Sequence, residues 1–229
     1  MCDSGLVLDF TLIHTDRKRI NITVERDRRI VVRAPKSCSE ERVQALLQRK
    51  KLWLFEKLRS GQKFPDEYNE KEFVSGETLL YLGRHYPLRV SKRDVNGIRF
   101  DREFVISHLH QSKAPMLLKQ WYVKRAKEKL APRVASFART LGVAYNAIRV
   151  SEMEYRWGSC TPKKNLVFNW KLIKAPLFVI DYIIVHELAH LIEPNHSDDF
   201  WNIVAAQVPK YQKAKEWLKQ NGSVLESSL

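Results

Sequence analysis

Cysteine is rare in this chain of 229 residues. The three cysteines, Cys2, Cys38 and Cys160, are scattered, so they form neither an even set for disulfide pairing nor a closely spaced zinc-binding pair. Their scarcity argues against a small secreted fold held together by disulfides. We therefore predict a protein of the reducing cytoplasm.

Long apolar runs and phosphate-binding loops are missing as well. No segment approaches the roughly 20 apolar residues that a membrane-spanning helix needs, and residues 1–5 have neither the basic start nor the apolar core of a secretory signal. The sequence has no glycine-rich loop of the Walker type and no group of carboxylates that suggests a two-metal site. We therefore expect no transmembrane segment and no P-loop nucleotide site.

Acidic residues are few relative to basic ones. The chain has 26 Asp and Glu against 40 Lys and Arg, a formal net charge of +14, and 44% hydrophobic residues, which can form a sizeable core. Such an excess favours anionic partners such as nucleic acid, nucleotides or an acidic membrane surface. The alternative is that the basic side chains only keep the protein in solution.

One short motif carries the clearest chemistry. His186 and His190 are four residues apart, so on a helix both rings can turn toward one metal ion. Glu187 follows the first histidine and is placed to hydrogen-bond a water at the metal without ligating it, as a general base requires. The pattern predicts a zinc-dependent hydrolase with an open position for water.

The third ligand must come from beyond this helical turn. Glu193 shares the face of His186 but lies roughly 10 Å further along the helix axis. Pro194 is expected to end or kink the helix and to let His196 approach the metal from a second direction. We rank His196 ahead of Glu193, and both ahead of Glu216.

The motif follows an apolar run, residues 176–185, that is typical of a helix buried on nearly all sides. A glutamate and two histidines at the end of such a helix are costly without partners, and a metal ion would provide them. The alternative is an amphipathic helix whose histidines fall four apart by chance. His85, His108 and His110 lack ligand spacing and are expected to be surface or hydrogen-bonded residues.

The flanking sequence indicates an α+β protein. A first helix should begin at Ser39 and end near residues 60–61, a linker should cover residues 62–71, and a long helix with a basic face should cover residues 115–141. The first three strands are expected to form a meander, and the last is our candidate for positioning an extended peptide substrate as an added strand. The expected strands cover residues 6–13, 20–25, 29–33, two strands around Gly83 within 76–90, a hairpin formed by 97–100 and 104–107, and the strands 147–151 and 165–172, with a turn rich in small residues at 155–161 between the last two.

The long helix and the segment after the metal motif each suggest a role. The basic residues of the long helix form either an anion-binding surface or a solvated face; they are Lys119, Lys124, Arg125, Lys127, Lys129 and Arg133. Beyond the motif, Ser197 should cap a helix whose Phe200 and Trp201 anchor His196 by packing.

Several stretches of this chain together resemble the YgjP-like metal-dependent hydrolases, relatives of the SprT-type and Wss-type zinc metalloproteases. The resemblance rests on residues 155–160, Asn169, 181–191 and 195–201. Together with the strand pattern, which predicts a mostly-β N-terminal region with a helix at 1–110, the resemblance implies a zincin-like catalytic domain at 111–229 with its active-site helix packed on a small sheet. It also implies zinc ligation by His186, His190 and His196, with Glu187 as the catalytic acid.

The leading hypothesis is therefore a zinc-dependent metallopeptidase that acts on a peptide or protein. Some relatives act on proteins crosslinked to DNA, which a basic surface would suit. The alternatives are a metal-dependent nucleotide phosphohydrolase of the pyrophosphatase type, with Lys163 and Lys164 near the phosphates, and a nucleic-acid-binding protein. The second alternative leaves Glu187 without a task, and no nucleic-acid-binding module is recognisable.

Overall fold

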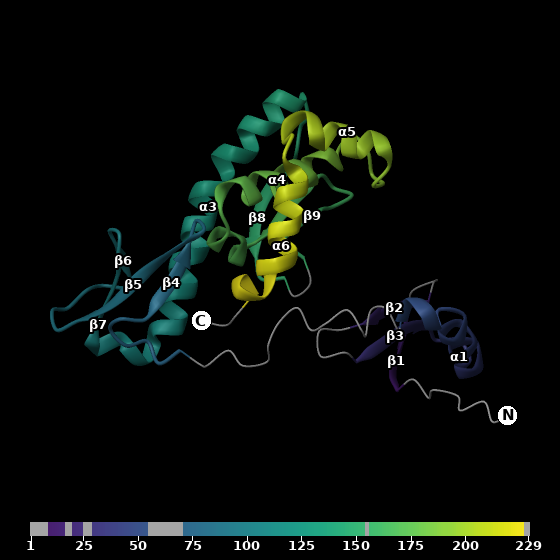
Figure 1. The fold of residues 1–229 in the computed structure, drawn as a ribbon, viewed down its shortest axis with the longest axis horizontal. Helices are drawn as coiled ribbons and strands as arrows, with labels where there is room; N and C mark the ends of the chain where they lie inside the picture. Colours follow the sequence, from purple (N-terminus) through teal and green to yellow (C-terminus); the bar gives the residue numbers. More distant parts are fainter. Residues whose placement is uncertain (1–8, 17–19, 25–28, 55–70, 154–155, 227–229) are drawn as a thin grey trace. The chain divides into compact units, whose positions relative to one another are not determined.

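The computed structural model describes residues 9–16, 20–24, 29–54, 71–153 and 156–226. The chain divides into two compact units, residues 1–65 and 66–229, and each combines helices with strands (Figure 1). The predicted α+β class is confirmed. The predicted division into an N-terminal region (1–110) and a catalytic domain (111–229) stays a prediction.

The first unit is a three-stranded sheet with a helix, and the expected meander is wrong. The strand order is β1-β3-β2, in which β3 pairs with β1 in parallel and with β2 antiparallel. The central strand contributes the buried residues Ile30, Val32 and Ala34, so the most apolar strand occupies the middle. The elements are β1 Phe10–Thr15, β2 Asn21–Val24, β3 Ile30–Pro35 and α1 Glu40–Arg49.

Helix α1 begins where the sequence predicted. The hydroxyl of Ser39 accepts a hydrogen bond from the backbone N–H of Arg42, which caps the helix, and Val43 and Leu47 face the sheet. The expected end of this helix near residues 60–61 and almost all of the expected linker at 62–71 lie outside the described residues.

The second unit opens with a four-stranded sheet in the order β4-β5-β7-β6. Both predicted strand pairs are confirmed: β4 and β5 join through Leu82 and Gly83, whose φ angles are +49° and +77°, and β6 pairs antiparallel with β7. The strands are β4 Thr78–Tyr81, β5 Arg84–Ser91, β6 Arg99–Phe100 and β7 Phe104–Ser107.

A long helix connects this sheet to the rest of the unit. After a 3-10 helix, η1 (His108–Lys113), α3 covers Ala114–Leu141 and ends at Gly142 in the left-handed conformation. Its Trp121 packs edge-on against Tyr81 of β4 and Phe104 of β7. In Figure 1, the β4–β7 sheet lies at one end of α3 and helices α4 to α6 lie toward the other.

The remaining elements form a second small sheet and a group of helices. The strand order is β8-β10-β9, so β10 lies in the centre, parallel to β8 and antiparallel to β9. These elements are β8 Ala147–Ser151, β9 Gly158–Cys160, β10 Asn165–Asn169, the 3-10 helix η2 Trp170–Lys174, α4 Leu177–Ala189, α5 Asp198–Gln207 and α6 Tyr211–Glu226.

The central place of β10 makes our substrate-strand prediction wrong. Both edges of β10 are already paired, by β8 and β9, so no peptide can add to it as a further strand. The stretch around residue 158, expected to be a turn, instead forms the short edge strand β9, which packs next to α4. The edge next to the metal motif therefore belongs to β9.

The turn between β4 and β5 is joined to the segment just before α4. The backbone N–H groups of Leu82 and Gly83 donate to the carbonyl oxygens of Ile173 and Lys174, at 3.0 and 2.8 Å. A Cβ atom on Gly83 would lie 2.6 Å from Cγ of Pro176, so only glycine permits this close approach. Among the described helices, none is both long and apolar enough to cross a membrane.

Candidate metal centre

Helix α4 carries the first two histidines of the motif. As predicted, it is buried on most sides: the residues from Val179 to Ala189 are nearly all buried, apart from Asp181 and His186. The helix ends at Ala189, with His190 as its C-cap, and backbone hydrogen bonds from Leu191 and Glu193 close a turn after it. The chain thus turns before it reaches Pro194, which brings His196 back toward the helix.

The structure brings His186, His190 and His196 together. One ring nitrogen from each lies within 4.8 Å of the others, and Nε2 of His196 lies 3.1 Å from Nε2 of His186. Three nitrogens that share a tetrahedral zinc ion at about 2.0–2.1 Å would be about 3.3 Å apart. The spacing of the His186 and His196 nitrogens is therefore close to that of a zinc site.

The other candidate ligands do not join this group. The side chain of Glu193 accepts a hydrogen bond from the backbone N–H of Asn195 at 3.0 Å, and Glu216 pairs with Gln220 and Lys219. The backbone carbonyl of Glu193 lies 3.3 Å from Nδ1 of His190. That contact keeps the proton of His190 on Nδ1 and leaves its Nε2 free.

Burial holds the two histidines of the helix motif in the neutral form that binds metal. Burial, reinforced by the neighbouring His190 and His196, lowers the pKa of His186 to about 3, and burial also lowers the pKa of His190. Within the described part of the chain, the buried Nδ1 of His186 has no hydrogen-bond partner. Three imidazole nitrogens at one point fit a zinc ion well.

Glu187 lies beside the histidines and is almost entirely buried, with 6% of its surface exposed. Burial raises the pKa of its carboxyl group to about 7, while a hydrogen bond from the backbone N–H of Cys160 and the charge of Arg156 lower it. A Cβ atom on Gly158 would lie 2.6 Å from both Cγ and Oε1 of Glu187. The edge strand β9 therefore forms one wall of the site.

Sequence reasoning assigned no role to Gly158 or Cys160. Both were part of the motif that carries the resemblance, but the stretch looked like an ordinary turn. Gly158 lies against the buried carboxylate of Glu187, and neither composition nor motif spacing reveals such a contact. Tyr155, which belongs to the same motif, lies outside the described residues.

His196 is packed as expected by the helix that follows it. Ser197 caps α5 by accepting a hydrogen bond from the backbone N–H of Phe200. The ring of Phe200 lies edge-on to His196 with centroids 4.7 Å apart, and the ring of Trp201 stacks on it at 5.7 Å. The predicted anchoring by Phe200 and Trp201 is confirmed.

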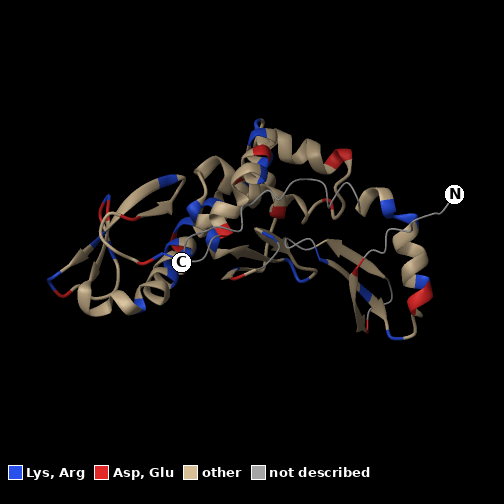
Figure 2. Cartoon of the chain, turned by 60° about the horizontal axis from the view of Figure 1, so that its bottom comes forward, with Lys and Arg blue, Asp and Glu red and all other residues tan. Residues whose placement is uncertain are grey.

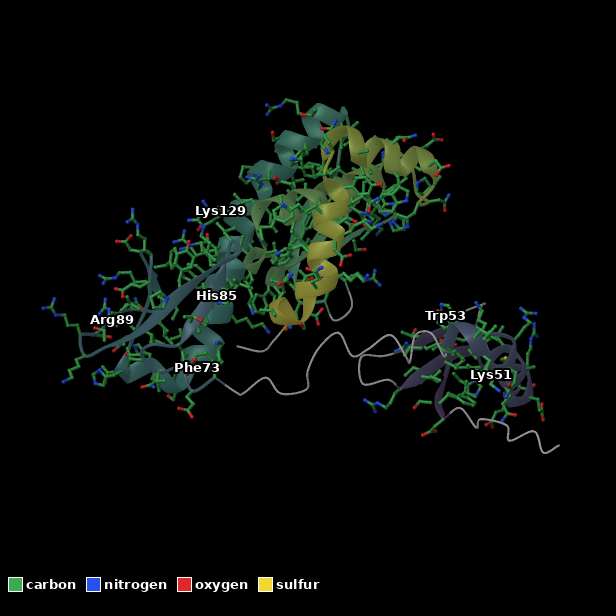
Figure 3. All side chains as sticks on the ribbon, viewed as in Figure 1. Lys51, Trp53, Phe73, His85, Arg89 and Lys129 are labelled. Atoms are coloured by element: carbon green, nitrogen blue, oxygen red, sulfur yellow. The ribbon has the colours of Figure 1, made fainter. Side chains whose placement is uncertain are left out.

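Figure 2 marks the Lys and Arg positions of the chain in blue, and those of α3 are only partly available for a ligand. Arg133 forms two 2.6 Å hydrogen bonds with Asp181 of α4, and Lys119 and Arg125 pair with Glu152 and Glu128. The other three are exposed and form no ion pair within the described ranges; they are Lys124, Lys127 and Lys129, the last of which is labelled in Figure 3.

The three remaining histidines of the second unit are not part of the site. His85, labelled on β5 in Figure 3, lies 3.5 Å from the hydroxyl of Thr78. His108 contacts the Ser91 carbonyl oxygen, and His110 lies 3.8 Å from Asp94. The prediction that they are surface or hydrogen-bonded residues is confirmed.

A comparison with known protein families agrees with the sequence resemblance. The family described as YgjP-like, metallopeptidase domain, matches residues 18–221. No curated protein matches the chain. Among solved structures, the chain is similar to the metallopeptidase zymogen of Pyrococcus abyssi abylysin, with 20% sequence identity and a TM-score of 0.38 over 44% of this chain and 98% of that chain.

Proposed function

Because the chain belongs to the YgjP-like family through its metallopeptidase domain, we propose that it is a zinc-dependent peptidase that cleaves peptide bonds in peptides or proteins. In this proposal His186, His190 and His196 hold the zinc ion, and Glu187 acts as general base and then as general acid. The single observation that carries it is the convergence of three histidine nitrogens within 4.8 Å beside a buried glutamate.

A zinc ion held by the three histidines would polarise the scissile carbonyl and lower the pKa of an attacking water toward roughly 7. Glu187 takes the proton of that water and passes it to the leaving amine. A carboxyl group whose pKa is raised to about 7 by burial suits both steps, since it can accept and release a proton near neutral pH.

The outer edge of β9, the edge strand of its sheet, supports a peptide as substrate. Gly158 and Cys160 lie opposite Phe168 and Leu166 of β10, while the ladder hydrogen bonds flanking the strand are made by Trp157 and Thr161. The backbone groups of Gly158 and Cys160 therefore point away from β10, and the N–H of Cys160 reaches Glu187. An extended substrate that pairs with this edge would pass directly beside Glu187.

The variant Glu187→Gln tests the assignment. It should retain zinc, because Glu187 is not a ligand, and should lose hydrolysis of casein and of short peptides by a factor on the order of 100 or more. Metal analysis and initial rates of the same preparations give both numbers. A variant that cleaves substrate as fast as wild type would remove Glu187 from the mechanism.

A nucleotide or nucleic-acid partner stays a prediction, as does a cytoplasmic location. The three exposed lysines on α3, together with Arg125, whose pairing with Glu128 is at the surface, are the part of the chain that such a partner would use. The nucleic-acid hypothesis predicts a salt-sensitive affinity for DNA that is lost when the charges of Lys124, Arg125 and Lys129 are reversed together. Phosphate release from nucleoside triphosphates, assayed beside casein and a DNA-linked protein, separates the phosphohydrolase alternative from the peptidase.

A further inference from the structure

Four aromatic rings form a continuous stack that runs from His196, the third histidine, to Tyr182, which lies on α4 one turn before His186. The ring of His196 stacks on Trp201 at 5.7 Å and 22°, Trp201 on Tyr211 at 5.3 Å and 15°, and Tyr211 on Tyr182 at 6.3 Å and 23°. These rings, called the ring stack below, come from the loop after α4, from α5, from α6 and from α4 itself.

Both ends of the ring stack lie at the histidine group. Tyr182 is 5% exposed and lies one helical turn before His186, with their ring centroids 5.8 Å apart. The stack therefore starts on the helix that carries two of the histidines and ends on the third. Helix α6 contributes Tyr211, in the middle of the stack, and Lys215, whose Nζ lies 4.3 Å from the centre of the Trp201 ring.

His196 depends on these rings for its orientation. Its side chain belongs to an exposed loop residue, and within the described ranges its only hydrogen-bond distance is the 3.1 Å contact between the Nε2 atoms of His196 and His186. His190, in contrast, is oriented by the Glu193 carbonyl oxygen. Metal-binding histidines are normally fixed through their second ring nitrogen, so for His196 aromatic packing takes over that task.

We propose that Tyr211 is a positioning residue for His196, acting through the ring of Trp201. The C-terminal helix α6 thereby sets how tightly the site holds zinc, although it supplies no ligand. This inference rests on the proposed ligation by His196. It goes beyond the packing by α5, because α6 contacts none of the three histidine rings directly in the ring contacts of the described residues.

The hydroxyl group of Tyr211 is not needed for this role. It accepts a hydrogen bond from the exposed side chain of the neighbouring Gln212 at 2.9 Å, whereas the ring makes both stacking contacts. Tyr211→Phe should therefore preserve the function, and Tyr211→Leu should remove it. Trp217→Leu is a matched control, because Trp217 is a partly buried aromatic residue of the same helix that packs on the core and makes no ring contact with the stack within the described ranges.

The test is a zinc affinity for each variant, measured by competition with a chromophoric chelator, together with the absorption spectrum of the cobalt-substituted protein. We expect Tyr211→Leu to weaken zinc binding on the order of 10-fold and to alter the cobalt spectrum. Tyr211→Phe and Trp217→Leu should stay within about 2-fold of wild type in the same assay. Circular dichroism of the metal-free proteins checks that all are folded.

Two results would overturn the inference: equal zinc affinity of Tyr211→Leu and Tyr211→Phe, or an equal loss in Trp217→Leu, which would indicate general loosening of α6. If Tyr211→Leu does not fold, Tyr211→Met carries the same expectation. Failure of the proposed function looks different, because wild type itself would then bind no zinc or would lose none on His196→Ala.

Discussion

Replacing Gly158 by alanine is the sharpest perturbation of the proposed general base. The added methyl group would lie 2.6 Å from two atoms of Glu187, whereas ordinary contacts are about 3.4–4 Å, so the carboxylate must move by roughly 1 Å. The backbone of Gly158 is not in the left-handed region, so alanine fits the strand itself. The effect should therefore fall on Glu187 and leave the fold intact.

A displacement of about 1 Å in a catalytic group can cost on the order of 100-fold in rate, which corresponds to about 2.7 kcal/mol of transition-state stabilisation. We expect Gly158→Ala to lower kcat/KM for casein or a peptide by this factor while zinc content stays at the wild-type level. Initial rates and metal analysis on one preparation are sufficient, with a thermal melt to confirm folding.

Two controls separate this steric effect from damage to β9. Ser159→Ala changes the neighbouring residue, whose side chain points to the opposite face of the strand, and should leave the rate nearly unchanged. In a Glu187→Asp background, the shorter side chain leaves room for the methyl group, so the added cost of Gly158→Ala should be smaller. A Gly158→Ala enzyme within about 3-fold of wild type would refute the reasoning.

Three further predictions follow from the same structure. His196→Ala should lower zinc content, while Glu193→Ala should leave it nearly unchanged because that carboxylate is bound to the Asn195 N–H; metal loss only in the Glu193 variant would contradict the ligand assignment. Burial lowers the pKa of Lys174 from its ordinary 10.5 to about 7. Between these two pH values the unfolded state binds more protons than the folded state, so the free energy of unfolding should rise with pH from about 7 to 10.5. This increase, at most about 1.4 kcal/mol per pH unit, should disappear when urea titrations are repeated on Lys174→Met. An unchanged pH dependence in that variant would contradict the assignment to Lys174. Arg133→Met removes two hydrogen bonds to the half-buried Asp181 and should lower the free energy of unfolding by about 1–2 kcal/mol, which an unshifted urea midpoint would rule out.

The elements whose signals are local could be predicted well. The cap at Ser39, the apolar run before His186 and the glycine after Leu141 each act within one or two helical turns, and all three helices begin or end close to the expected residues. The grouping of the three histidines could also be predicted, because His186 and His190 share a helical face and the turn before Pro194 leaves His196 little distance to cover.

Strand pairing beyond the two local hairpins, β4–β5 and β6–β7, and long-range contacts in general, could not be predicted, since they depend on residues far apart in the sequence. The parallel pairing of β1 with β3 and the central place of β10 follow from competition among all strands for buried positions. Arg133 and Asp181 are 48 residues apart, and the basic face of α3 therefore looked freer than it is. The roles of Gly158 and Tyr211 exist only once the strands and helices have packed.

The backbone hydrogen bonds between the β4–β5 turn and the segment before α4 limit how far this chain can be shortened. A fragment that begins at residue 111 would leave the carbonyl oxygens of Ile173 and Lys174 without the Leu82 and Gly83 N–H groups, one turn from the start of the histidine helix. It would also expose the face of α3 on which β4 and β7 pack. The shortest piece that carries the triad in a folded state should therefore reach back to β4, although every candidate catalytic residue lies more than 70 residues further on.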